Sequence, residues 1–152
     1  MPSRAGLDGS PLPLTASTPM TGLVFFYGTL MSGFRRPGRA RLDHSLKSVG
    51  RGWIPAALFD LGIYPAAVPA ADSRVWGEVH EMLDSEAVLS ALDEIEGYRP
   101  SQPDASLYTR AEMPVTFIDG RVATAWTYLY NAPLGKAQRI ESGDYLAYLK
   151  QR

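Results

Sequence analysis

The chain has 152 residues, 45% of them hydrophobic, a length that suits one globular core and is too short for two independent ones. Fifteen Lys and Arg residues against sixteen Asp and Glu residues give a net charge of -1, which supplies no field to gather nucleic acid or an anionic membrane surface. The absence of cysteine excludes disulfides and cysteine-bound metals, and the histidines His44 and His80 lack ligand spacing. We therefore expect one domain with no metal, cofactor, nucleic-acid partner or membrane partner.

The first 20 residues are rich in proline and small polar residues and show no hydrophobic period. Such a composition predicts a disordered segment at 1–20, followed by a single domain at 21–152. No apolar run approaches the roughly 20 residues of a membrane helix, and the start lacks the pattern of a secretory signal. The expected location is the cytoplasm.

The segment GLVFFY at 22–27 is a continuous apolar run that ends at Gly28. This pattern predicts a central strand that is buried on both faces. Residues 40–48 predict a short helix, and residues 48–68 predict short extended pieces broken by glycine and proline. Residues 74–83 alternate between apolar and polar side chains, which predicts another strand.

A helix is predicted from Asp84 to about Glu96. Asp84 is a good N-cap residue, Glu86 adds a favourable charge to the first turn, and Gly97 suits the position after the last turn.

The rest of the chain predicts a hairpin and a closing helix. Residues 108–117 and 121–130 alternate on either side of an Asp-Gly turn, which predicts two antiparallel strands. Ser142 is a candidate cap for the terminal helix. About six strands with few helices favour an α+β fold with a strongly bent or barrel-like sheet.

The segment LDEIEGY at 92–98 places three acids in the last helical turn, where the helix dipole disfavours negative charge. At about 100° per residue, Glu96 falls between Leu89 and Leu92 on the apolar face. Glu94 points to solvent, and Asp93 lies on the flank. Of the three acids, Glu96 alone is predicted to face inward.

Burial, the helix end and the neighbouring acids all disfavour the ionised form of Glu96, so its pKa should be raised. A carboxylate in this state suits proton transfer. Two structural alternatives remain: Glu96 pairs with a buried arginine such as Arg110 or Arg99, or the helix frays and exposes it.

The turn YGTL at 27–30 follows the first strand, and Gly28 allows a sharp bend with its N–H groups left free. Successive amides of this kind can bind a carboxylate, although an ordinary strand-to-loop turn is the plainer interpretation. The phosphate-binding pattern GxxxxGK[ST] and the dinucleotide pattern GxGxxG are absent.

Taken together, VFFYGTLMSG at 24–33, LDEIEGY at 92–98 and YTR at 108–110 resemble the γ-glutamylcyclotransferase-like family, particularly its γ-glutamylamine cyclotransferase and avirulence-induced-protein-like branch. The resemblance runs from about Leu23 to Asn131 and includes YPA at 64–66 and GEV at 77–79. It implies an α+β fold, a small mixed β-barrel with a few flanking helices around a cavity.

The resemblance also implies an activity and a site. Glu96 would be the catalytic general acid and base, and Tyr27, Gly28, Thr29 and Leu30 would bind the substrate, chiefly through backbone donors. A γ-glutamyl amine or related γ-glutamyl compound would cyclise, releasing 5-oxoproline and the free amine, without metal or cofactor. The segment RPSQPDAS at 99–106 is expected to shape the pocket mouth.

Two other functions stay open from the sequence. One is a non-catalytic small-molecule-binding or regulatory protein that uses the same cavity. The other is a structural or interaction module, which predicts no cavity and an ion-paired Glu96.

Overall fold

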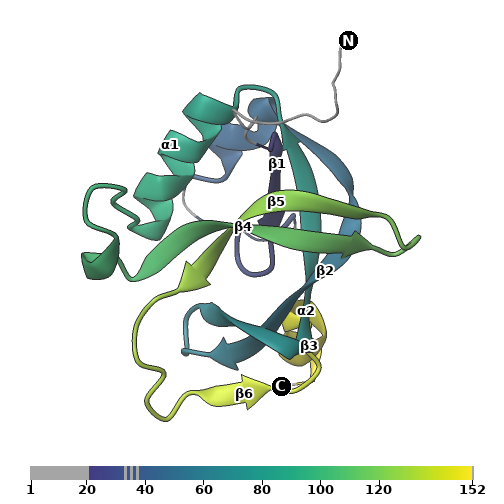
Figure 1. Cartoon of the computed structure of the whole chain (residues 1–152), viewed down its shortest axis with the longest axis vertical. Helices are drawn as coiled ribbons and strands as arrows, with labels where there is room; N and C mark the ends of the chain where they lie inside the picture. The colour runs from purple at the N-terminus through teal and green to yellow at the C-terminus, as the bar shows by residue number, and fades with distance from the viewer. Residues whose placement is uncertain (1–20, 33, 35, 37, 152) are drawn as a thin grey trace, which may run out of the picture.

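The computed structural model describes residues 21–32, 34, 36 and 38–151 (Figure 1). The predicted disordered segment at 1–20 lies outside the described residues.

Five strands form a closed barrel: β1 (Leu23–Phe26), β2 (Leu46–Asp60), β3 (Pro65–Met82), β4 (Tyr108–Phe117) and β5 (Val122–Tyr130). β1 pairs antiparallel with β3 and parallel with β5, and the circuit closes through the antiparallel pairs β3–β2, β2–β4 and β4–β5. The mixed barrel confirms the predicted α+β fold class.

Strand β1 is central, as its apolar run predicts. Val24, Phe25, Phe26 and Tyr27 are all buried, although successive side chains of a strand point to opposite faces. All four side chains belong to the common core, and the Arg39 guanidinium lies over the Phe26 ring.

The prediction of short extended pieces at 48–68 is wrong. Strands β2 and β3 have 15 and 18 residues and pair with each other along nearly their whole length. The register shifts between Ser48 and Gly50 and again between Pro55 and Ala56. Such irregularities bend a strand without ending it, so these glycine and proline residues turn the corners of the barrel.

Helix α1 (Ser85–Glu96) lies beside the barrel, as Figure 1 shows, and has the predicted ends. The Asp84 side chain accepts a hydrogen bond from the Ala87 amide at 3.2 Å. Gly97 follows with a φ of 73°, in the left-handed region that favours glycine. The helix contributes three buried side chains to the common core: Val88, Leu89 and Leu92.

The predicted helix at 40–48 is shorter than expected. A 3-10 helix, η1 (Ala40–Ser45), ends where β2 begins, and a second one, η2 (Pro103–Ala105), precedes β4. No helix in the described ranges is long and apolar enough to cross a membrane.

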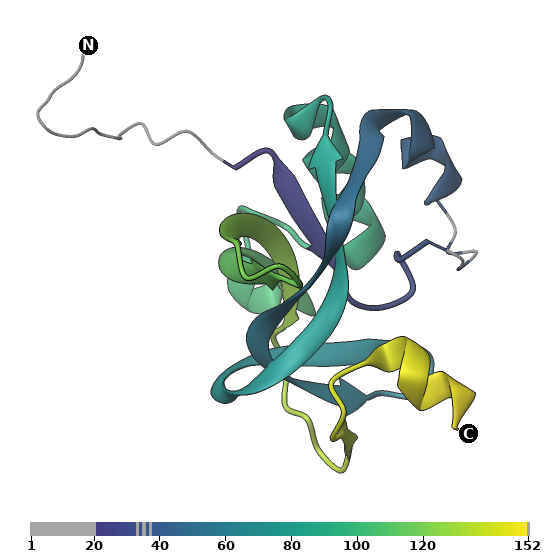
Figure 2. The same cartoon turned by 90° about the vertical axis from the view of Figure 1, so that its right-hand side faces the viewer.

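The chain ends with β6 (Gln138–Ile140), which pairs with β2, and α2 (Tyr145–Lys150). Both lie at the far end of the β2–β3 hairpin, as Figures 1 and 2 show. The predicted cap of the terminal helix is wrong, because Asp144 accepts from the Ala147 amide at 3.1 Å. The Ser142 hydroxyl instead accepts from the Asp144 amide at 3.2 Å.

Candidate functional site

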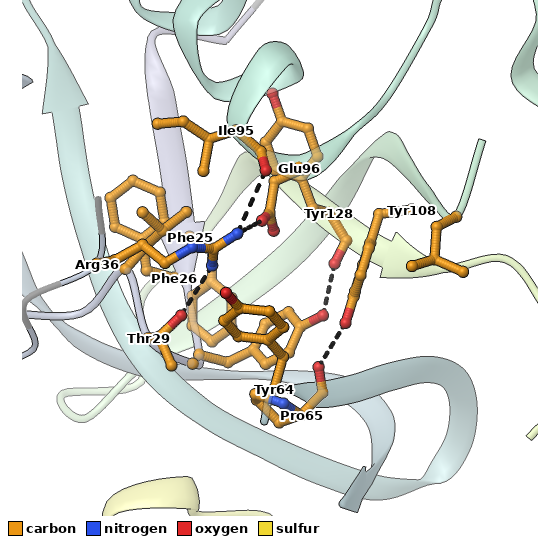
Figure 3. Close-up of a pocket in the computed structure, with 14 residues that line it drawn as sticks. Phe25, Phe26, Thr29, Arg36, Tyr64, Pro65, Ile95, Glu96, Tyr108 and Tyr128 are labelled. Atoms are coloured by element: carbon orange, nitrogen blue, oxygen red, sulfur yellow. Dashed lines mark hydrogen bonds and ion pairs between the residues drawn. The ribbon is translucent and has the colours of Figure 1, made fainter. Parts of the chain in front are cut away.

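A cavity of about 150 Å³ opens where the end of β1, the end of α1 and the start of β3 meet (Figure 3). The structure brings the predicted site residues together there, although they lie far apart in the sequence. Its walls come from fourteen residues: Phe25, Phe26, Tyr27, Gly28, Thr29, Leu30, Arg36, Tyr64, Pro65, Ile95, Glu96, Leu107, Tyr108 and Tyr128.

The turn after β1 lies tightly against the start of β3. A Cβ atom at Gly28 would lie 2.8 Å from Cγ of Pro65, so only glycine fits this close approach. The amides of Gly28, Thr29 and Leu30 donate no hydrogen bond to the described residues. Three backbone donors beside the cavity are therefore without a described protein partner.

Glu96 is the last residue of α1, and its side chain is only 12% exposed. Its Oε1 lies 3.0 Å from Nη2 of Arg36, while its Oε2 accepts no hydrogen bond from the described residues. Burial raises the pKa of the Glu96 carboxyl above its ordinary value, and the Arg36 guanidinium partly opposes that rise. The predicted inward position and the predicted direction of the pKa shift are both confirmed.

Arg36 is a cavity residue that the sequence analysis missed. The alternative that Glu96 pairs with a buried arginine is confirmed, but the partner is Arg36 and neither of the named candidates, Arg110 and Arg99. Nη1 of Arg36 donates to Oγ1 of Thr29 at 2.8 Å, and Nη2 also donates to the Ile95 carbonyl at 3.3 Å. Arg36 lies 60 residues from Glu96 in a stretch rich in glycine and proline, where no hydrophobic period points to a partner.

The planar guanidinium of Arg36 also stacks on an aromatic ring. Its Cζ lies 4.3 Å from the centre of the Tyr64 ring, which fixes the plane of the group across the cavity (Figure 3). Tyr64 belongs to the YPA stretch that carried part of the family resemblance, but its contact with Arg36 had no sequence signal.

Asp93 is not on an exposed flank, so the prediction that Glu96 alone turns inward is wrong. The side chain of Asp93 is 13% exposed and forms a bidentate ion pair with Arg110. Its Oδ1 lies 3.0 Å from Nε and its Oδ2 lies 3.2 Å from Nη2. The Tyr128 hydroxyl donates to the same carboxylate at 2.5 Å. Strands β4 and β5, which carry these partners, cover this side of the helix.

Three buried tyrosines form fixed walls. The hydroxyl of Tyr27 donates to the Tyr128 carbonyl at 2.6 Å, and that of Tyr108 donates to the Pro65 carbonyl at 2.9 Å. Burial raises the pKa of all three phenols, and the Glu96 charge adds to the rise at each of them. These walls stay neutral, so among the described lining residues Arg36 and Glu96 are the two that carry charge.

The opening of the cavity is apolar, since Tyr64 and Leu107 line it and are 37% and 52% exposed. Leu107 directly follows the segment 99–106 that was expected to shape the mouth. In the part of the chain that the structure describes, no three His, Cys, Asp or Glu side chains gather to hold a metal ion.

Comparison with known proteins identifies relatives along most of the chain. Residues 24–147 match the family described as "Gamma-glutamyl cyclotransferase, AIG2-like". A Vibrio cholerae protein named "Putative gamma-glutamylcyclotransferase" is 34% identical over 131 residues, which cover 83% of this chain and 96% of that protein. The "Gamma-glutamylcyclotransferase family protein YtfP" of Escherichia coli is 36% identical over 90 residues, 59% of this chain and 66% of that protein.

Solved structures show the same fold. The solution structure of ytfP from Escherichia coli has a TM-score of 0.58 at 28% identity and covers 83% of this chain and 97% of that one. The crystal structure of an AIG2-like protein from Mus musculus has a TM-score of 0.61 at 23% identity, with 81% and 88% covered. At that identity the second likeness concerns the fold alone. The sequence match confirms the resemblance drawn from the motifs, and the chain belongs to the gamma-glutamyl cyclotransferase, AIG2-like family.

Proposed function

We propose that this protein is a γ-glutamylcyclotransferase that acts on a γ-glutamyl amine or a related γ-glutamyl compound, releasing 5-oxoproline and the free amine. Family membership supports the general activity. The observation that carries the specific proposal concerns hydrogen bonds among the described residues: Glu96 receives one on its carboxylate, the amides of the turn after β1 donate none, and both line one cavity.

The substrate supplies its own nucleophile in this reaction. The α-amino nitrogen attacks the γ-carbonyl carbon, a new carbon–nitrogen bond closes the five-membered ring, and the bond from that carbon to the leaving nitrogen breaks. The attacking ammonium loses two protons and the leaving amine gains two. Glu96 takes each proton from the first nitrogen and passes it to the second, so it ends in its starting state.

The site suits these steps. A carboxyl group whose pKa is raised by burial is closer to the pKa that general acid and base catalysis requires at neutral pH. The amides of Gly28, Thr29 and Leu30 can donate to the γ-carbonyl oxygen as it gains negative charge. A cavity of about 150 Å³ holds a small group in a curled conformation, which favours ring closure by proximity. The proposed chemistry needs no metal or cofactor.

The test is incubation of the purified protein with a panel of γ-glutamyl amines and amides while the release of 5-oxoproline is measured. We expect turnover of at least one compound and its loss in the Glu96→Gln variant. Binding of a panel member without any 5-oxoproline would instead favour a non-catalytic protein that uses the same cavity.

A further inference from the structure

We propose that Arg36 binds the α-carboxylate of the γ-glutamyl portion of the substrate, and that this carboxylate displaces Glu96 from the Arg36 guanidinium. The inference rests on the proposed function and adds to it a residue that selects substrates. The carboxylate of Glu96 lies 3.0 Å from Nη2 of Arg36, at the position proposed here for a substrate carboxylate.

The guanidinium is already positioned for such a ligand. Its hydrogen bonds to Thr29 and Ile95 hold it at the junction of the turn and the end of α1, and the Tyr64 ring supports one face (Figure 3). The Arg36 guanidinium has five N–H donors, and it donates three hydrogen bonds to the described residues. A planar guanidinium with N–H donors to spare can bind the two oxygens of a carboxylate in a bidentate arrangement.

Charge balance also favours this exchange. A γ-glutamyl compound carries an α-carboxylate and an α-ammonium group, and the described lining residues of the cavity include one cation and one anion, Arg36 and Glu96. If the substrate carboxylate pairs with Arg36, the ammonium can pair with Glu96, so one ion pair becomes two and no buried charge is left without a partner. An unpaired charge among these apolar and neutral walls would carry a large penalty.

The exchange places the reacting groups where the chemistry needs them. The ammonium that must lose its protons comes to lie against the carboxylate that accepts them. The amides of the turn remain available for the γ-carbonyl oxygen. Because the site offers a full positive charge to the carboxylate, it should discriminate strongly against compounds that lack this group.

The kinetic test compares two substrates that differ in the carboxylate alone: γ-glutamyl-4-nitroanilide and 4-aminobutanoyl-4-nitroanilide. Both release a coloured amine on cyclisation, and an aromatic amine suits the apolar mouth. We expect the parent protein to prefer the first compound, and Arg36→Gln to lower kcat/KM for it by roughly 10- to 100-fold, the effect of a lost charge-assisted hydrogen bond. The kcat/KM for the second compound should fall by much less, so the ratio of the two values narrows, and Arg36→Lys should recover part of the preference.

Arg110→Gln is the matched control, because it removes an equally buried arginine from an acid of the same helix outside the cavity. It should leave the ratio of the two kcat/KM values unchanged, whatever its effect on stability. An Arg36→Gln variant that retains the parent ratio overturns the assignment, because the carboxylate would then be bound by other groups, such as the turn amides.

A binding measurement separates this inference from the proposed reaction. 5-Oxoproline and 2-pyrrolidinone are the same ring with and without the carboxylate, and neither can be cyclised again. NMR titration of the parent should show a preference for 5-oxoproline, and Arg36→Gln should remove it. This result in a protein that turns over neither anilide counts against the proposed function while the role of Arg36 stands. Equal affinity of the parent for both rings overturns the role of Arg36.

Discussion

Helix α1 carries two acid–arginine pairs three residues apart, and they differ in what surrounds them. Asp93 and Glu96 are almost equally buried, at 13% and 12% exposure, as are their partners Arg110 and Arg36, at 16% and 13%. Asp93 receives two bonds from Arg110 and one from the Tyr128 hydroxyl. From the part of the chain that the structure describes, Glu96 receives one bond, on one oxygen, and it lines the cavity.

Burial by itself therefore does not separate a structural carboxylate from a reactive one. A carboxylate with both oxygens bonded to protein groups has no oxygen left free for a further partner. A buried carboxylate with a free oxygen keeps a raised pKa and can bind a proton or an ammonium group. The following predictions test this distinction.

The largest expected effect is on turnover. Glu96→Gln should lower kcat for the proposed cyclisation by at least about 100-fold, because it removes the proposed proton-transfer group but keeps the shape of the side chain. Asp93→Asn, which leaves Glu96 intact, should retain activity within about fivefold in protein shown by circular dichroism to be folded. A Glu96→Gln variant that releases 5-oxoproline near the parent rate would remove Glu96 from the mechanism.

The second-largest expected effect is on kcat/KM and concerns the turn that follows β1. Thr29→Pro removes one backbone donor and should lower kcat/KM by roughly 100-fold if that amide meets the developing oxyanion. Thr29→Val is the control, since it retains the amide and removes only the hydroxyl that accepts from Arg36. Equal kinetics in the two folded variants would show that the amide of residue 29 has no part in binding or turnover.

For stability the order of the two acids should be reversed, so Asp93→Asn should lower the free energy of unfolding more than Glu96→Gln does. Breaking a fully buried ion pair costs about 3–5 kcal/mol, and the slight exposure of the Asp93–Arg110 pair reduces our expectation for Asp93→Asn to about 2–3 kcal/mol of unfolding free energy. Glu96→Gln should lose clearly less, because the amide oxygen of glutamine can still accept from Arg36, Arg36 keeps its other contacts, and an acid leaves the negative end of the helix. Denaturant unfolding of both variants measures the difference, and equal losses would contradict the comparison.

A smaller effect concerns pH. In the proposed mechanism the free enzyme needs ionised Glu96, so kcat/KM should fall as pH drops through the pKa of this carboxyl. Arg36 lowers that pKa against the effect of burial, and the other groups that face Glu96, the phenols of Tyr27, Tyr108 and Tyr128, are neutral. Arg36→Gln should therefore move the acidic limb to higher pH, whereas Arg110→Gln should not move it. A shift to lower pH in the Arg36 variant would contradict the proposed electrostatics.

The smallest expected effect is that of chelation. In the described ranges, no three His, Cys, Asp or Glu side chains gather to hold a metal ion. Activity measured after exhaustive treatment with EDTA should equal that of untreated protein. Loss of activity that zinc restores would require a different mechanism.

Much of the fold was predictable because its signals are local. The apolar run of β1, the Asp84 cap and Gly97 stop of α1, and the alternating strands around the Asp-Gly turn each depend on neighbouring residues. The long β2 and β3 strands were missed because glycine and proline usually end a strand. Here a closed barrel needs tight corners, and pairing along the whole hairpin keeps the bent strands together.

The features of the candidate site were likewise predictable only where their signals are local. The sequence by itself determined that Glu96 turns inward at the end of a helix and that a glycine-containing turn with spare amides follows a buried strand, since helical period and turn chemistry act over a few residues. Only the tertiary structure decided that these two features share a cavity, that Arg36 rather than Arg110 meets Glu96, and that Asp93 is covered by β4 and β5. Contacts between residues 17 to 60 positions apart depend on how the barrel closes, and no local pattern records that closure.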